Sequence, residues 1–243
     1  ETSFLSGNGQ TGAMVMGRPQ ADTIILNRAG LFLPFTPVRP PPSQGAHLEE
    51  IRQLMAAGQY QKAADFLYEL SQKEGYNGTH WIDPLVPACS LQIRLPGRGA
   101  ARDYLRGTDY PTGVTGARWS DARGTVVQRV FVSRADDVVV VSLRSADGAT
   151  PLDVDLAFAQ HDPSVTEKGE SAPAEAFSLV ETHATAGAGL TFHSKFAKAW
   201  PGSLQGCEAA ARIVAHGGTA TPVGDTIAVR GATEILVLAR VAV

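Results

Sequence analysis

Short segments of alternating apolar and polar residues, each followed by a turn, recur from residue 85 onward and constrain the fold of this chain most. Strict alternation is found at residues 91–95, and the valine-rich runs 125–132 and 138–143 are also strand-like and are separated by the turn-prone residues 134–137. A period of two is typical of a strand that buries one face. We expect further strands at residues 152–159, 177–183, 189–198, 208–215, 226–229 and 235–241. Many short strands at this spacing predict an antiparallel sandwich rather than a βαβ fold.

The N-terminus predicts a β-hairpin. Gly7-Asn8-Gly9 stands between two short apolar runs, and Asn and Gly both tolerate the positive φ angles that tight turns require. The cluster is not a phosphate-binding loop, because no Gly-Lys-Ser/Thr follows it. We interpret it as a turn, and Asn8 would meet a ligand if this turn faces a neighbouring domain.

Residues 47–73 form the one clearly helical segment, and Gly58 divides it into two short helices. Glu49 and Glu50 stand in the first turn and Lys73 in the last, where the helix dipole favours each charge. Before this segment, prolines between residues 34 and 42 predict an extended connector. The expected fold is therefore mainly β: an antiparallel β super-sandwich with a two-helix insertion near residues 47–73, in one domain over residues 1–243.

Composition and charge limit the kinds of molecule that this chain is expected to bind. The 243 residues are 44% hydrophobic and 19% charged, enough apolar material for a large core. A net charge of −3 gives no basic field for nucleic acid or an anionic membrane, and we expect neither as a partner. Cys89 and Cys207 are the only cysteines, so one disulfide is possible but a zinc site from cysteines is not.

No residue is assigned a catalytic role. A glycosidase needs two carboxyl groups about 5–10 Å apart across the sugar, one of them with a raised pKa. We interpret the candidate acids as solvated or turn-capping residues: Asp83, Asp103, Asp109, Asp121 and Asp162. The six histidines are scattered without metal-ligand spacing, so neither a metal nor another cofactor is expected.

The most ligand-like stretch is residues 76–84, Tyr-Asn-Gly-Thr-His-Trp-Ile-Asp-Pro. Aromatic faces stack on sugar rings, and polar side chains bond hydroxyl groups. This makes His80 and Trp81, together with Asn8, the candidate substrate-binding residues. The alternative is that Trp81 fills the seam between helices and sheet, since an exposed Trp is uncommon.

Several motifs in order resemble the N-terminal domain of glycoside hydrolase family 95, the α-L-fucosidase type, a glycosyl hydrolase family 65-like N-terminal domain. The opening, Leu5-Ser6-Gly7-Asn8-Gly9 through Met16-Gly17, is followed by Ile25-Leu26-Asn27. The similarity continues through these segments: residues 51–63, 104–110, 128–133 and 227–238. It covers essentially the whole chain.

The resemblance implies that catalysis belongs to a following (α/α)6 barrel that is absent from this chain. The domain would support that C-terminal catalytic domain and lend a loop to the rim of its active site. The parent enzyme would cleave a terminal α-L-fucosyl or related linkage of a carbohydrate substrate with inversion and without a cofactor. A periplasmic or extracellular location is expected on the same basis.

Two other functions remain open. A stand-alone carbohydrate-binding module would use Trp81, Trp119 and Trp200 as an aromatic platform. A protein-interaction scaffold would instead expose an apolar face near residues 237–243.

Overall fold

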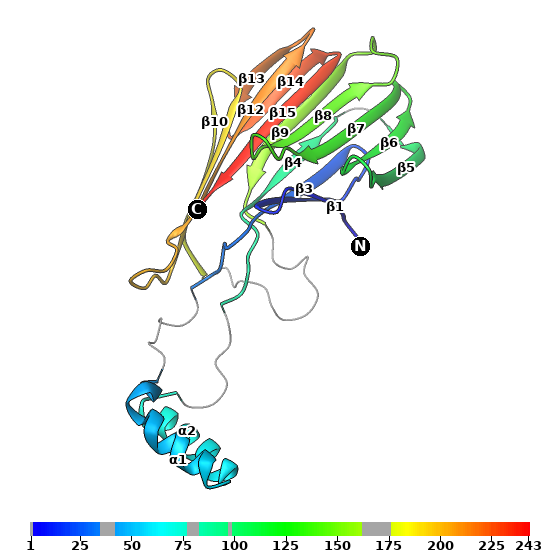
Figure 1. The fold of residues 1–243 in the computed structure, drawn as a ribbon. Helices are drawn as coiled ribbons and strands as arrows, with labels where there is room; N and C mark the ends of the chain where they lie inside the picture. The colour runs from blue at the N-terminus through cyan, green and yellow to red at the C-terminus, as the bar shows by residue number, and fades with distance from the viewer. Residues whose placement is uncertain (1, 35–41, 77–82, 97–98, 162–175) are drawn as a thin grey trace. The chain divides into compact units, whose positions relative to one another are not determined.

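The structure is a computed structural model that describes residues 2–34, 42–76, 83–96, 99–161 and 176–243. Two antiparallel β-sheets make up most of it (Figure 1). The first sheet has seven strands, in the order β1 (Phe4–Gly7), β2 (Thr11–Val15), β3 (Ala21–Arg28), β4 (Cys89–Arg94), β9 (Leu152–Ala159), β14 (Thr226–Ala232) and β13 (Thr219–Val223).

The second sheet has eight strands, in the order β10 (Phe177–Thr185), β11 (Gly189–Phe196), β12 (Gly206–His216), β15 (Glu234–Ala242), β8 (Val139–Ser145), β7 (Gly124–Val132), β6 (Val114–Asp121) and β5 (Arg102–Asp109). The inward residues of both sheets share one hydrophobic core, as in a sandwich. This confirms the predicted fold class.

Alternating side chains build this core. In β8 and β9 every second residue is buried, from Val139 to Ser145 and from Leu152 to Phe158. Trp119 on β6 and Phe192 on β11 are the largest fully buried side chains. Complete burial of one large apolar side chain is worth roughly 1.5–3 kcal/mol, so the two-residue period of the sequence drives association of the sheets.

A second compact unit comprises residues 36–83 and is inserted between β3 and β4. It contains the 3₁₀ helix η1 (Gln44–His47) and two α-helices, α1 (Leu48–Ala56) and α2 (Tyr60–Lys73). Gly58 separates the α-helices with a φ of 72°, a left-handed conformation that glycine adopts without strain. The predicted two-helix insertion is confirmed. Within the described residues, no helix has the length and apolar character needed to span a bilayer.

Most predicted strands are present with small shifts at their ends, and the N-terminal hairpin is formed by β1 and β2. Three strands were not predicted from the residue pattern: β5, β6 and β13. The connector predicted at residues 34–42 lies outside the described residues except at its two ends. The missed β5 and β6 matter most, because they form the cavity described below.

Candidate functional site

Asn8 lies in the turn between β1 and β2, as the sequence predicted. Its side-chain oxygen accepts hydrogen bonds from the backbone N–H groups of Gln10 (2.8 Å) and Thr11 (2.7 Å). Its amide nitrogen donates to the carbonyl of Ser133 (3.0 Å) and to a carboxylate oxygen of Asp137 (2.9 Å). These bonds use both donors and both acceptor sites of the amide, so Asn8 has a complete structural role.

Asp137, in the turn between β7 and β8, is the centre of this arrangement. Its carboxylate accepts hydrogen bonds from Asn8, from the Thr11 hydroxyl (2.8 Å) and from the Arg28 guanidinium (2.5 Å). The bonds from Asn8, Thr11 and Arg28 hold the pKa of Asp137 at about 2. We call Asn8, Thr11, Arg28 and Asp137 the clasp, because they join the seven-stranded sheet to the eight-stranded one.

A second polar connection between the sheets lies in the interior. Asp22 on β3 is only 3% exposed and accepts a hydrogen bond from the side-chain amide of Gln128 on β7 (2.6 Å). Burial raises the pKa of Asp22, against the lowering effect of bonds from Gln128 and the backbone. A raised pKa is a property of catalytic acids, but this carboxyl is enclosed between the sheets and its bonds are structural.

The other ligand-binding candidates fare differently. His80 and Trp81 lie outside the described residues, as does Asp162, so their predicted roles remain predictions. Trp119 is 0% exposed, which corrects the idea that it belongs to a surface aromatic platform. Its indole faces the core because β6 directs odd-numbered residues inward. A three-tryptophan platform for sugar binding is therefore wrong as predicted.

Neither cysteine is in a disulfide in the structure, and both are buried. Burial raises the pKa of the Cys89 thiol and of the Cys207 thiol. The Cys207 thiol also donates to the carbonyl of Ala88 at 3.6 Å. Buried neutral thiols are poor nucleophiles, so these residues behave as core side chains.

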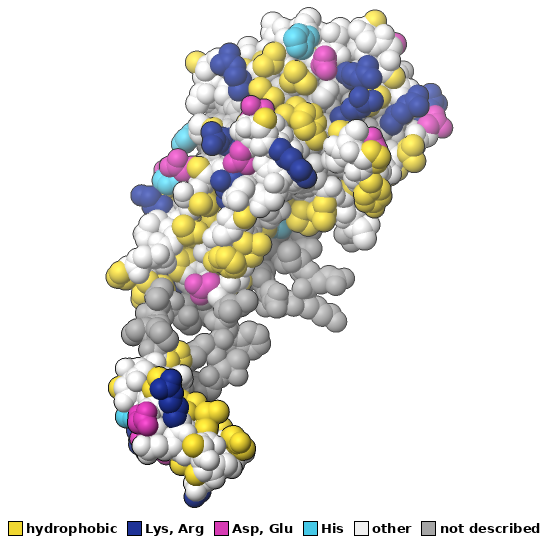
Figure 2. Space-filling view, viewed as in Figure 1, with side chains coloured by type: hydrophobic (Ala, Val, Ile, Leu, Met, Phe, Trp, Pro, Cys, Tyr) yellow, Lys and Arg dark blue, Asp and Glu magenta, His cyan; other side chains and the backbone are white. Residues whose placement is uncertain are grey.

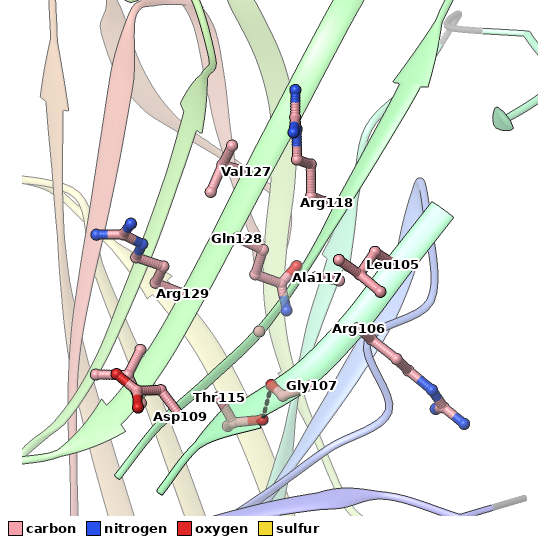
Figure 3. A pocket seen from close by; sticks show the side chains of 12 residues that line it. Leu105, Arg106, Gly107, Asp109, Thr115, Ala117, Arg118, Val127, Gln128 and Arg129 are labelled. Atoms are coloured by element: carbon pink, nitrogen blue, oxygen red, sulfur yellow. Dashed lines mark hydrogen bonds between the residues drawn. The ribbon is translucent and has the colours of Figure 1, made fainter. Parts of the chain in front are cut away.

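A cavity of about 350 Å³ opens on strands β5, β6 and β7, where no site was predicted (Figure 3). Its floor is formed by Gly107 and Gly116, which are opposite each other in the β5–β6 ladder. Leu105 and Val127 supply apolar walls, and Arg118 and Arg129 stand at the rim. Two adjacent glycines leave backbone bare where other strands carry side chains, and this creates the depression.

The absence of a side chain has a different consequence at each of the two floor positions. A Cβ on Gly116 would collide with the backbone carbonyl of Gln128, so β6 and β7 can approach as they do only with glycine there. A Cβ on Gly107 would meet nothing within 4 Å, so its absence leaves open space above the floor. The sequence signal for this site was the Gly107 and Gly116 pair, but it becomes visible only once the register of β5 and β6 is known.

A second cavity, of about 420 Å³, lies at the ends of β11, β12 and β15. It is lined by His193, Lys195 and Glu208, among others. His193 lies 3.8 Å from the Glu181 carboxylate, measured from its Nδ1 atom. Charges of both signs favour neither an anionic nor a cationic ligand.

The described part of the chain contains no cluster of three or more His, Cys, Asp or Glu side chains suited to a metal. The geometry thus defines an antiparallel β-sandwich domain with internal polar connections and one glycine-floored surface cavity.

Comparison with known proteins gives this domain its family. The family described as glycosyl hydrolase family 65, N-terminal domain, matches residues 1–242, and the chain belongs to it. No curated protein matches the chain. One solved structure that matches is described as a putative kojibiose phosphorylase from human microbiome, at 7% identity and a TM-score of 0.42. That match covers 99% of this chain and 33% of the other, so this chain spans about a third of that protein's length.

Proposed function

We propose that this chain is the non-catalytic N-terminal domain of a carbohydrate-cleaving enzyme, an α-L-fucosidase-like exo-glycoside hydrolase of family 95. The observation that carries the proposal is the family match over residues 1–242. The assignment to family 95 rests in addition on the order of motifs in the sequence, from Gly7-Asn8-Gly9 to residues 227–238. The domain would support a following (α/α)6 barrel that holds the catalytic groups.

The bonds of the two carboxyl groups that join the sheets are consistent with a non-catalytic role for this domain. Glycoside hydrolysis needs one carboxyl that gives a proton and one that activates water or attacks the sugar. Asp22, with its raised pKa, bonds to Gln128 between the sheets, and Asp137, with its lowered pKa, bonds to Arg28. Both carboxyl groups join the two sheets through these bonds. Neither is therefore available to act on a substrate.

The proposed partners are the C-terminal catalytic domain of the same polypeptide and the carbohydrate substrate, without nucleic acid, membrane or cofactor. Contact with the substrate would come from His80 and Trp81 rather than from Asn8. The amide of Asn8 already makes four hydrogen bonds, and a sugar hydroxyl would have to displace one of them.

The experiment compares the 243-residue chain with its parent polypeptide on an aryl α-L-fucoside and an aryl α-glucoside. We expect no turnover by the chain alone, and fucoside hydrolysis with inversion by the parent, followed by NMR of the first-formed anomer. Turnover by the isolated chain would contradict a non-catalytic role. A parent that cleaves glucosides but not fucosides would contradict the family 95 assignment alone.

The rim contact is tested in the parent polypeptide with His80→Ala and Trp81→Ala. If the segment lies at the rim, each substitution raises KM for the fucoside several-fold, since a stacking or hydrogen-bonding contact is lost. Asn8→Gln is the comparison, because it disturbs the clasp without removing a substrate contact. Unchanged KM in both His80→Ala and Trp81→Ala would remove these residues from the rim.

A further inference from the structure

Three arginines on the outer face of the eight-stranded sheet, two of which line the glycine-floored cavity, differ from Arg106, which also lines it and donates to the carbonyl of Met16. Arg118, Arg129 and Arg144 stand on the outward face of three adjacent strands, β6, β7 and β8. Val127 is opposite both Arg118 and Arg144 in the ladders, and Arg129 is two residues further along the same face of β7. In the part of the chain that the structure describes, none of the three makes a side-chain hydrogen bond or an ion pair.

Like charges on neighbouring strands repel one another, so a bound anion would relieve the repulsion between these arginines. This arrangement occurs on a chain whose net charge is −3, where acids would be available to balance the arginines. Figure 2 shows Lys and Arg side chains among apolar ones on the face over strands β5 to β8. The described carboxylate in the cavity lining is Asp109, which accepts a hydrogen bond from the Thr112 hydroxyl at 2.7 Å.

The cavity floor suits a flat, partly apolar ring. Gly107 and Gly116 present bare backbone, while Val127 and the 71% exposed Leu105 offer aliphatic surface beside it. A volume of about 350 Å³ fits within the range of small-ligand sites. A pyranose ring has apolar C–H faces and hydroxyl edges, so it can lie on such a floor with its polar substituents at the rim.

We propose that this cavity is a binding site for a carboxylate-bearing sugar, a uronate residue of an acidic saccharide. The carboxylate would be held by Arg118 and Arg129, whose planar guanidinium groups match carboxylate geometry. In Figure 3 both guanidinium groups extend outward from the rim, so binding requires rotation of these exposed side chains toward the floor. The proposal does not depend on the fucosidase assignment.

Isothermal titration of the 243-residue chain with a galacturonate trisaccharide, compared with the corresponding neutral galactose trisaccharide, tests the site. We expect saturable binding of the acidic sugar only, weakened by raising NaCl from about 50 to about 500 mM because the ion pairs are exposed. The double variant Arg118→Gln/Arg129→Gln should weaken binding by about tenfold or more, as expected for loss of charge-assisted hydrogen bonds.

Two further variants separate the floor from the charge. Gly107→Leu fills the open space without changing charge and should abolish binding, while the melting temperature stays within a few degrees because its Cβ meets no atom. Arg240→Gln removes an exposed arginine from β15, outside the cavity, and should leave affinity within twofold.

Four results would overturn the proposal: no binding of the acidic sugar, equal binding of both sugars, binding unaffected by Gly107→Leu, or an equal loss of affinity in Arg240→Gln. Inorganic phosphate and poly-glutamate are the remaining probes. If either binds through Arg118 and Arg129 while the galacturonate trisaccharide does not, the arginines serve a simple anion or an acidic protein surface, and the saccharide assignment is wrong.

Discussion

Two carboxylates connect the same pair of sheets, and their surroundings shift their pKa values in opposite directions. Asp137 lies near the surface, bonds to Asn8, Thr11 and Arg28, and has a pKa of about 2. Asp22 lies in the interior, bonds to Gln128 and backbone N–H groups without a cation, and has a raised pKa. The charged form of Asp137 therefore stabilises the folded domain, whereas the charge on Asp22 opposes folding.

This difference shows that hydrogen bonds alone do not decide whether a carboxylate supports a fold. Both side chains are well bonded, but Asp22 is only 3% exposed, whereas the side chain of Asp137 is 22% exposed and also pairs with the Arg28 guanidinium. Gln128 offers Asp22 only an amide, and its own side-chain oxygen is buried without a hydrogen-bond partner among the described residues. Desolvation is consequently the dominant effect at Asp22, and hydrogen bonding from Asn8, Thr11 and Arg28 is the dominant effect at Asp137.

The largest expected effect is that of Asp137→Ala. Removing the carboxylate leaves the Asn8 amide, the Thr11 hydroxyl and the Arg28 guanidinium without their acceptor, and we expect a loss of about 2–3 kcal/mol in the free energy of unfolding. Urea denaturation measures it. Asp136→Ala is the matched control, because the neighbouring carboxylate bonds only within its exposed turn and should cost about 0.5 kcal/mol or less. Equal losses would show that the clasp does not join the sheets.

Asn8→Ala should have the next largest effect, about 1–2 kcal/mol. The substitution removes two bonds that shape the β1–β2 turn and two that reach the β7–β8 turn. In a double-mutant cycle, Asn8→Ala and Asp137→Ala should lose less together than the sum of the single variants, since they share a bond. Additive losses would indicate that the two residues act independently.

The pH dependence follows from the lowered pKa of Asp137. A carboxyl with a lower pKa in the folded state than its unfolded value of about 3.9 contributes stability that is present above that value. This contribution disappears as the pH falls through about 2, the folded-state pKa of Asp137. Because the group is near the surface, about 1 kcal/mol of the fall between pH 4 and pH 2 should be absent from Asp137→Asn. Parallel stability curves for both proteins would contradict the assigned pKa.

The sequence predicted the sandwich because its central strands carry the two-residue period along their whole length. In β9 the alternation of Leu152, Val154 and Leu156 with Asp153 and Asp155 identifies the buried face. The missed β5 has eight residues with none buried, so no apolar alternation marks it as a strand. β13 is similarly exposed at the edge of its sheet. Edge strands are fixed by pairing with a neighbour, which a local pattern does not contain.

The clasp and the cavity also depend on tertiary pairing that the local sequence does not contain. The turns that contain Asn8 and Asp137 were both predicted, but the bond between these residues spans 129 positions of the sequence. Likewise, the cavity depends on Gly107 facing Gly116 and on the arginines of neighbouring strands sharing a face. Local chemistry predicts where a turn forms or a glycine is tolerated, while tertiary register decides which groups meet.

The smallest expected effect, and one of opposite sign, is that of Asp22→Asn. An amide keeps the shape of the carboxyl and removes the buried charge, and rotation of the Gln128 amide would place its unbonded oxygen opposite the new N–H donor. Since burial raises the folded-state pKa of Asp22, the wild-type domain is penalised progressively as the pH rises above the unfolded value of about 3.9. Asp22→Asn should therefore gain stability relative to wild type between pH 3 and pH 7, measured by urea denaturation at both values. The control is Asp137→Asn, whose stability relative to wild type should fall as the pH rises from 2 to 4. If Asp22→Asn instead loses stability relative to wild type as the pH rises, the buried carboxylate favours folding.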